Sequence, residues 1–89
     1  MNGQQLNYIR RAVNLSQKEL AEKVEVSLVT INRYEKGRQE PQPSTIRRLQ
    51  KALRYTEEDL VTIAELLEGD ADKRSHARLK MKLQQQADL

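Results

Sequence analysis

Residues 16–38 read SQKELAEKVEVSLVTINRYEKGR and carry the signals of two short helices joined by a tight turn. Ser16 and Glu19 stand three residues apart, which is the spacing of a capping box at the start of a helix. Ser27 offers another N-cap only a few residues beyond the first helix. Gly37 is the glycine that commonly follows a helix C-terminus. We therefore expect one helix directly after Ser16 and another between Ser27 and Gly37.

The side chains at the corner between these two helices favour a close, nearly perpendicular crossing. Ala21 is small and stands at the fifth position of the first helix, so the second helix can approach it closely. Val26 in the turn and Ile31 in the second helix would fill the corner. Such a crossing makes the second helix project from the body, where it would fit a DNA major groove about 12 Å wide.

The rest of the chain also has helical periodicity, and no segment has the alternating pattern of a strand. Apolar spacing predicts a helix over about residues 4–13 and two later helices, one capped by Ser44 and one by Thr56 with Asp59. Two prolines make residues 38–43 an extended connection. We therefore predict an all-α fold, a compact bundle of about five short helices that contains a helix-turn-helix.

The last twenty residues have a weaker pattern. Leu79 and Leu83 form a narrow apolar stripe, and a helix with so small an apolar face either packs on a neighbour or frays. We therefore divide the chain into a helix-turn-helix DNA-binding domain at residues 1–69 and a polar C-terminal helix or tail at residues 70–89.

Charge is distributed unevenly along the 89 residues, whose formal net charge is +3. Residues 1–54 hold eleven Lys and Arg against five Glu, whereas residues 55–69 hold five acidic residues and no base. Residues 70–89 hold five bases and three Asp. A basic end and an acidic end are expected when a single face meets a polyanion, although chance clustering on a highly charged surface is the alternative.

The side-chain inventory argues against an enzyme, a metal site or a bound cofactor. The chain has no Cys, and therefore no thiolate ligand for zinc or iron. It has no glycine-rich phosphate loop, and its single histidine, His76, stands in the polar tail, where we expect it to be solvated. No stretch approaches the roughly 20 apolar residues of a membrane span, and the N-terminus does not resemble a signal peptide. We expect a cytoplasmic, nucleoid-associated protein with no membrane partner.

Taken together, these motifs resemble the lambda-repressor-like, Cro and XRE family of helix-turn-helix regulators. The resemblance covers roughly residues 6–67 and is carried by LSQKELA, VS, TI and EKGR, which begin at residues 15, 26, 30 and 35, followed by Pro41. It implies a sequence-specific regulator that binds double-stranded DNA. The sequence departs from the family at Glu25 and Asn14, where relatives usually carry Gly, so we expect both residues to adopt the left-handed conformation, at roughly 1 kcal/mol for Glu25.

The resemblance implies base contacts from the outward residues of the second helix, which are Leu28, Val29, Asn32 and Arg33. Arg33 suits a bidentate contact to guanine and Asn32 suits adenine, while the two aliphatic side chains can lie against thymine methyl groups. The alternatives are packing of the aliphatic pair against a neighbouring loop, and a phosphate contact or a solvated charge for Arg33.

The resemblance also implies phosphate contacts from Gln17, Ser27, Lys36 and Arg38. Gln17 begins a helix, where free amides favour a phosphate, and its carboxamide could bond either that phosphate or a neighbouring side chain. Arg10 and Glu35 match positions that form an ion pair in several relatives, and we assign them a structural role. Arg11, Arg47 and Arg48 could approach flanking phosphates or lie on solvated helix faces.

One such module contacts too few base pairs to define a unique site, so the resemblance leads us to expect a repressor that binds a palindromic operator as a homodimer. The expected dimer contact is the acidic fifth helix with Leu60, Leu66 and Leu67. The basic tail either covers that helix in the same chain, extends the dimer or binds a protein partner. The alternative function is a protein-interaction module, such as an antitoxin or an anti-repressor, that keeps the helix-turn-helix fold.

Overall fold

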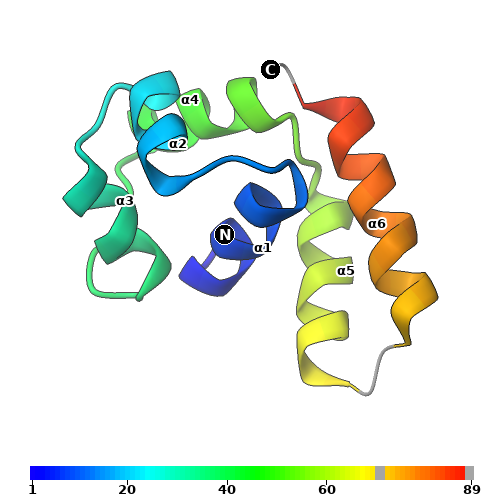
Figure 1. Cartoon of the computed structure of the whole chain (residues 1–89). Coiled ribbons are helices and arrows are strands. Elements are labelled where there is room, and N and C mark those ends of the chain that lie inside the picture. Colours follow the sequence, from blue (N-terminus) through cyan, green and yellow to red (C-terminus); the bar gives the residue numbers. More distant parts are fainter. Residues whose placement is uncertain (70–71, 88–89) are drawn as a thin grey trace.

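The computed structural model describes residues 1–69 and 72–87, and within these ranges it contains six α-helices and no strand (Figure 1). The all-α fold predicted above is therefore confirmed. In chain order the helices are α1 (Gly3–Ala12), α2 (Gln17–Val24), α3 (Leu28–Glu35), α4 (Pro43–Leu53), α5 (Glu57–Glu68) and α6 (Lys73–Gln86). None of the described helices has the length and apolar character needed to cross a membrane.

Three of the six helices, α2, α3 and α5, begin at the caps that local sequence chemistry indicated. The Ser16 hydroxyl accepts the Glu19 amide at 3.0 Å, and the Glu19 carboxylate accepts the Ser16 amide at 3.0 Å, which confirms the capping box of α2. Thr56 and Asp59 form the same reciprocal pair at the start of α5. A third capping box, Asn2 with Gln5, begins α1 and was not predicted. Three of the six helices, α1, α2 and α5, thus begin with a reciprocal capping box.

The predicted cap of the fourth helix was wrong. We expected Ser44 to cap it, but Gln42 is the N-cap of α4, with no side-chain hydrogen bond, and Pro43 is the first helical residue. The reason is that proline has the backbone angle of a helix and lacks the amide that a first-turn residue would leave unpaired. Ser44 therefore lies inside the first turn of α4.

Three short connections each use a non-glycine residue in the left-handed conformation. Asn14 after α1 has φ 61° and Glu25 after α2 has φ 59°, as we predicted for both. Arg54 ends α4 in the same way, with φ 52°. A left-handed residue reverses the chain within one residue, so α2 and α3 are joined by only three residues and cross closely.

The hydrophobic core is centred on α1, which contacts α3, α5 and α6 (Figure 1). Every helix contributes at least one side chain with essentially no exposed surface; these include Leu6, Ile9, Leu20, Val24, Ile31, Leu49, Leu53, Ile63 and Leu83. The helix-turn-helix lies on one side of α1, and α5 with α6 lies on the other. α1 is therefore the element that joins the two sides.

Gly3 permits a close approach of α1 to the end of α3. A Cβ atom at this position would overlap the carbonyl oxygens of Tyr34 and Glu35, which belong to the C-terminal turn of α3. Since a backbone carbonyl cannot move aside as a flexible side chain can, only glycine fits here. The first turn of α1 is thereby held directly against the end of α3.

Residues 73–86 of the C-terminal segment pack on the rest of the chain. Leu79 and Leu83 of α6 are buried, so their narrow stripe packs on a neighbour, one of the two outcomes expected for the tail. Lys82 Nζ lies 2.8 Å from the Asp59 Oδ1 atom of α5, and the Gln84 amide donates to the Ala12 carbonyl at 2.8 Å. The basic helix therefore covers the acidic helix within the same chain. The ends of the predicted tail, residues 70–71 and 88–89, lie outside the described residues.

Candidate nucleic-acid interface

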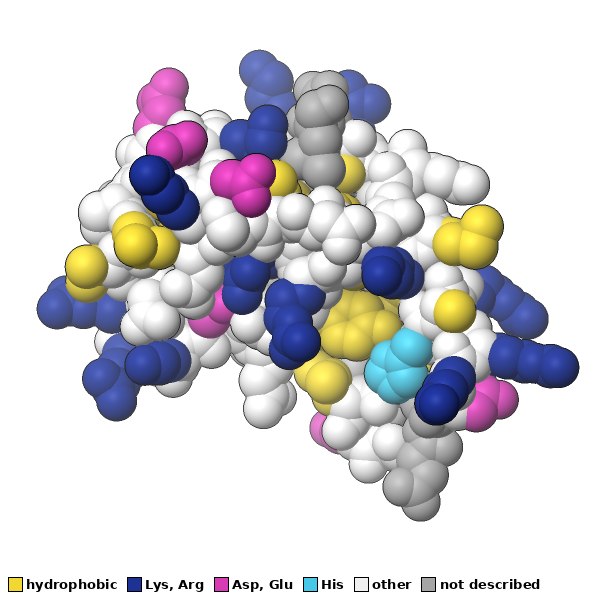
Figure 2. All heavy atoms as spheres, in the orientation of Figure 1, with side chains coloured by type: hydrophobic (Ala, Val, Ile, Leu, Met, Phe, Trp, Pro, Cys, Tyr) yellow, Lys and Arg dark blue, Asp and Glu magenta, His cyan; other side chains and the backbone are white. Residues whose placement is uncertain are grey.

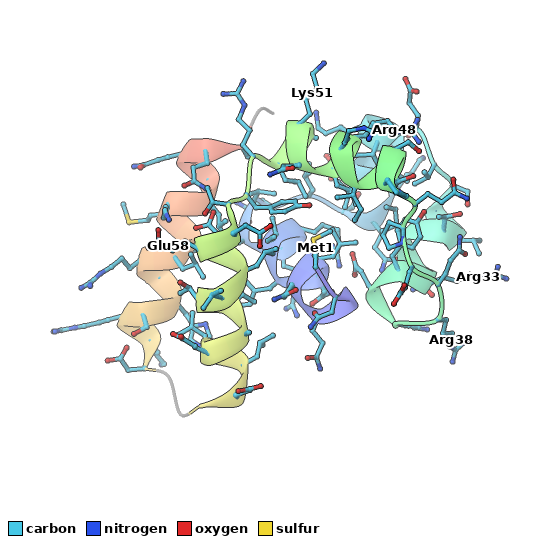
Figure 3. The ribbon with its side chains drawn as sticks, turned by 180° about the vertical axis from the view of Figure 1, so that it is seen from behind. Met1, Arg33, Arg38, Arg48, Lys51 and Glu58 are labelled. Atoms are coloured by element: carbon cyan, nitrogen blue, oxygen red, sulfur yellow. The ribbon has the colours of Figure 1, made fainter. Side chains whose placement is uncertain are left out.

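The helix α3 buries one edge and exposes the other. Ile31 is fully buried and Tyr34 nearly so, whereas Leu28 and Val29 are 47% and 59% exposed. Arg33 is also exposed, and its side chain points away from the body of the protein (Figure 3). On the side of the molecule formed by α3, Figure 2 shows apolar side chains bordered by Lys and Arg. Of the four residues predicted to contact bases, these three lie on one accessible edge.

The exposed aliphatic pair at the start of α3 is unusual for a helix in water. No neighbouring loop covers Leu28 or Val29, although such packing was the alternative considered for them. The Ser27 hydroxyl holds the helix start in place, because it accepts the Thr30 amide at 3.1 Å. Exposed apolar side chains on a fixed helix end can contact the thymine methyl group in a major groove.

Asn32, the fourth predicted base contact, is half-buried and faces α2. Its amide lies 3.5 Å from Gln17 Oε1, which is the outer limit of a hydrogen bond. So weak a bond can be exchanged for a stronger partner at little cost. Asn32 is thus less available than Arg33, and its contact to a base stays a prediction.

Gln17 is half-buried at the start of α2, and its carboxamide contacts neighbouring side chains. The amide donates to Glu35 Oε1 at 3.1 Å, while the oxygen faces Asn32. This is the second of the two roles considered for the Gln17 carboxamide. A phosphate contact at this position stays a prediction, and it would have to come from backbone amides at the start of α2.

Glu35 is the centre of a hydrogen-bond network that holds the end of α3. Arg10 Nε lies 2.6 Å from Glu35 Oε2, and the Arg10 and Glu35 side chains are only 13% and 5% exposed. Asn7 of α1 donates to Glu35 Oε1 at 2.8 Å, and the Gln17 amide shares that oxygen. Burial opposes ionisation of the carboxyl, but the hydrogen bonds from Arg10, Asn7 and Gln17 outweigh it and lower the Glu35 pKa.

The ion pair assigned to Arg10 and Glu35 from the sequence is therefore present in the fold, where it joins α1 to α3, and the Gln17 amide connects α2 to the same carboxylate. Asn7, the third side chain that bonds Glu35, was not predicted from the sequence. The available signal was its position one helical turn before Arg10, which places the two side chains on the same face of α1. An amide and a guanidinium on one helix face can meet the same carboxylate.

The cations expected to meet the DNA backbone follow α3 directly. Lys36 and Arg38 are exposed, and Gly37 between them turns the chain with φ 71°. Figure 3 shows Arg38 pointing outward from the same edge of the molecule as Arg33. The Ser27 hydroxyl, also expected at a phosphate, already bonds the Thr30 hydroxyl at 2.8 Å. The clearest candidates for phosphate contacts are therefore Lys36 and Arg38.

The flanking arginines do not share one environment. Arg47 and Arg48 are exposed on α4, and Arg48 Nη1 lies 3.6 Å from Glu25 Oε2, in the turn between α2 and α3. Because both side chains are solvated, this ion pair adds less than about 1 kcal/mol to stability. It does partly neutralise a carboxylate beside the recognition edge. Arg11 instead borders a cavity between α1 and α6.

His76 is not the solvated side chain that we expected. It is half-buried, and its Nδ1 atom lies 2.8 Å from the Tyr8 hydroxyl. The prediction failed because it treated residues 70–89 as polar tail, whereas the packing of α6 brings this histidine against α1. Across residues 1–69 and 72–87, no three His, Asp or Glu side chains are grouped as a metal site would require.

The comparisons with known proteins agree with this geometry. The helix-turn-helix family model matches residues 6–60, which extends from α1 to the first turn of α5. No curated protein and no solved structure matches the chain. The matched segment contains the close crossing of α2 and α3, the exposed edge of α3 and the cations that follow it. The chain belongs to the Cro/C1-type (XRE) family of helix-turn-helix DNA-binding regulators.

Proposed function

We propose that this regulator is a repressor that inserts α3 into the major groove of a palindromic operator and binds as a homodimer. The supporting observation is the exposed edge of α3, where Leu28, Val29 and Arg33 lie beside the cations Lys36 and Arg38. Base-edge contacts from the first group give sequence preference, whereas phosphate contacts from the second fix position. Occupying an operator blocks access to a promoter, in the cytoplasm and on nucleoid DNA.

The network around Glu35 supports the same proposal. A recognition helix must keep its angle to the body, because a small rotation at its base displaces every base contact. The end of α3 is bonded to both α1 and α2 through one carboxylate, and Gly3 lets α1 approach it without an intervening side chain. The helix that would enter the groove is therefore braced from behind.

Selection of bound duplexes from a random pool supplies the operator, its half-site spacing and its symmetry in one experiment. Binding of two variants is then measured on the selected operator and on a random duplex. Arg33→Ala should weaken operator binding by roughly 1–3 kcal/mol and relax one base preference, whereas Arg38→Ala should weaken both duplexes alike. Affinity should also fall steeply with salt, since bound phosphates release counterions. Equal losses on both duplexes for both variants would contradict the assignment of α3.

The dimer contact proposed from sequence needs revision, because Leu66 packs against the core and Leu67 lines the cavity between α1 and α6. Leu60 is buried in the core of its own chain and cannot contact a partner. Val61, on the outer face of the acidic helix α5, is 56% exposed. We propose that the dimer contact lies around Val61, among the carboxylates of α5, a helix that Figure 3 shows on the other side of α1 from Arg33 and Arg38.

Two matched substitutions separate the dimer contact from the DNA contact. Val61→Glu should shift sedimentation equilibrium toward the monomer, because it adds a carboxylate to a contact that already lies among the carboxylates of α5. Val29→Glu introduces the same side chain on α3 and should leave self-association unchanged while weakening operator binding. A wild-type protein that sediments as a monomer both free and on operator DNA would remove the homodimer from the proposal.

A further inference from the structure

A cavity of about 580 Å³ opens to solvent between α1 and α6, beside the last turn of α5. Its apolar lining comes from Tyr8, Ala12, Leu67 and Ala77, which belong to all three helices. Sites for small organic ligands usually have volumes of about 300–1,000 Å³ and mostly apolar walls. The cavity therefore has the size and lining of a ligand site, and the DNA-binding function makes no use of it.

The polar groups around this cavity favour an anion. Arg11, His76 and Lys80 line it, and among residues 1–69 and 72–87 no carboxylate does. Neither Arg11 nor Lys80 forms an ion pair with a carboxylate of the described residues. Figure 2 shows an apolar floor on this face, with Lys and Arg side chains around it and the imidazole at its edge. Two cations beside an apolar surface, unpaired with any acid of the described residues, complement an amphipathic anion.

His76 is held at the cavity by Tyr8. The Tyr8 hydroxyl lies 2.8 Å from His76 Nδ1, and the two ring centroids are 5.8 Å apart. Burial raises the Tyr8 pKa, so the phenol keeps its proton at neutral pH. When the phenol donates to Nδ1, the imidazole proton lies on Nε2, and a donor is left for a ligand.

We propose that this cavity binds a small amphipathic organic anion, an aromatic or branched-chain carboxylate. The apolar part lies against Tyr8 and Leu67, and the carboxylate bonds Arg11 and Lys80. A guanidinium binds a carboxylate through two parallel hydrogen bonds, which gives direction as well as charge. The class of ligand follows from the pairing of an apolar floor with unneutralised cations.

A ligand in the cavity would affect the position of α3 through the side chain of Asn7. This side chain lines the cavity and also donates to Glu35 Oε1 at 2.8 Å, at the C-terminal end of the recognition helix. A ligand oxygen that turns the Asn7 amide into the cavity draws it away from Glu35, which loses one of its donors, and the end of α3 is loosened. The ligand would then weaken operator binding, and this second step rests on the function proposed above.

Anilinonaphthalene sulfonate, an aromatic anion with a fluorescence response, is a suitable probe for the full chain. Its neutral analogue phenylnaphthylamine has the same rings without the charge. We expect saturable binding of the sulfonate and weaker binding of the amine. Arg11→Gln and Lys80→Gln should each weaken the sulfonate by roughly two- to fivefold, the range of one solvated charge pair, and leave the amine unchanged.

Two further variants locate the site. Ala77→Phe places a ring in the cavity from an exposed position and should abolish binding of both probes. Arg78→Gln removes a neighbouring exposed charge of α6 that does not line the cavity, and should change neither. Thermal unfolding followed by circular dichroism verifies that each variant is folded, and amide chemical shifts should move at Tyr8, His76 and Ala77 on titration.

Each outcome has a defined meaning. Equal affinity for the two probes, or sulfonate binding that survives Arg11→Gln and Lys80→Gln, would overturn the anion site. Binding that survives Ala77→Phe in a folded protein would place the probe elsewhere and also overturn it. Saturating sulfonate should weaken operator binding in the wild type but not in Ala77→Phe, and no effect would overturn the link through Asn7. Failure of DNA binding itself would contradict the proposed function and leave the fluorescence result standing.

Discussion

Two carboxylates in this protein, Glu35 and Asp59, perform similar structural tasks in different surroundings. Each accepts hydrogen bonds from neighbouring helices, and each has a lowered pKa although burial opposes its ionisation. Glu35 is bonded by Arg10, whose side chain is 13% exposed, so both members of the pair are withdrawn from water. Asp59 is fully buried, but its partner Lys82 is 45% exposed.

The different exposure of Arg10 and Lys82 should make the two ion pairs contribute differently to stability. A charge pair withdrawn from water costs much when one member is removed, because the other is left unmatched in a poorly solvated place. A pair open on one side gains less, since water screens the exposed member and can replace it. We infer that the end of α3 is held more firmly than α6. A rigid recognition helix and a more loosely attached C-terminal helix are the expected consequence.

The largest loss of stability is expected at the ion pair of Arg10 and Glu35, because both side chains are withdrawn from water. Arg10→Met keeps the aliphatic packing but leaves the Glu35 carboxylate with only amide donors, so the free energy of unfolding should fall by about 3–5 kcal/mol at neutral pH. Urea denaturation followed by circular dichroism measures this. The control is Arg11→Met, the next and exposed residue of α1, which should change stability by less than about 0.5 kcal/mol. Similar losses in both variants would show that the pair is not special.

The next largest loss of stability is expected at Gly3, where α1 lies directly against the end of α3. Gly3→Ala should reduce the free energy of unfolding by roughly 1–3 kcal/mol, because the new Cβ overlaps two backbone carbonyls of α3 and forces α1 away. Gly69→Ala is the matched control: its Cβ would lie 3.4 Å from the Glu65 carbonyl, which is an ordinary contact. Thermal unfolding of both variants makes the test. Unchanged stability of Gly3→Ala would mean that the two helices are not held at this distance.

A smaller loss of stability is expected at the ion pair of Asp59 and Lys82, because Lys82 is exposed to water. Lys82→Met removes one donor from Asp59, which keeps the Gln86 amide at 2.8 Å and the Thr56 amide at 2.9 Å. With the partner half exposed, the loss should be about 1 kcal/mol or less. Hydrogen exchange should show faster opening of α6 and little change in α3. Lys80→Met, on the same helix but away from Asp59, is the control, and a loss as large as that of Arg10→Met would reverse the comparison.

The smallest change in the free energy of unfolding is expected when the pH is lowered from 7 to 5. A carboxyl whose pKa is lowered by folding stabilises the protein above its unfolded pKa of about 4, and this stabilisation is lost as the pH falls through the lower folded pKa. Stability from Glu35 and Asp59 should therefore be constant above about pH 5 and decline below about pH 4. Arg10→Met and Lys82→Met should each flatten the decline, and a decline that both variants retain in full would assign it to other groups.

Local sequence chemistry predicted much of the helix-turn-helix. The hydroxyls of Ser16 and Ser27 bond amides three residues ahead, and Asn14 and Glu25 reverse the chain within one residue. Such interactions depend on neighbours along the chain and are visible in the sequence. The cap of α4 was mistaken because two local signals competed, and Pro43 at the first helical position prevailed over Ser44.

Contacts between distant segments were much less predictable. Resemblance to a family led us to pair Arg10 with Glu35, but it did not indicate Asn7, the space that only Gly3 leaves, or the contact of Tyr8 with His76. These depend on where α1 lies against α3 and α6. The same packing brings the Gln17 carboxamide to Glu35, although position at a helix start alone favoured a phosphate.

Short runs of residues thus determined the helix spacing, the caps and the turns. The reason is that hydrogen bonds of the first turn and the burial of one helix face act over three or four positions. The exposed edge of α3 followed from the same periodicity. The bracing of that helix by Glu35, the burial of Asp59 beneath α6 and the cavity beside Tyr8 arise from packing of segments far apart in the chain. Their geometry is set by the summed volume and shape of the core, which no local pattern specifies.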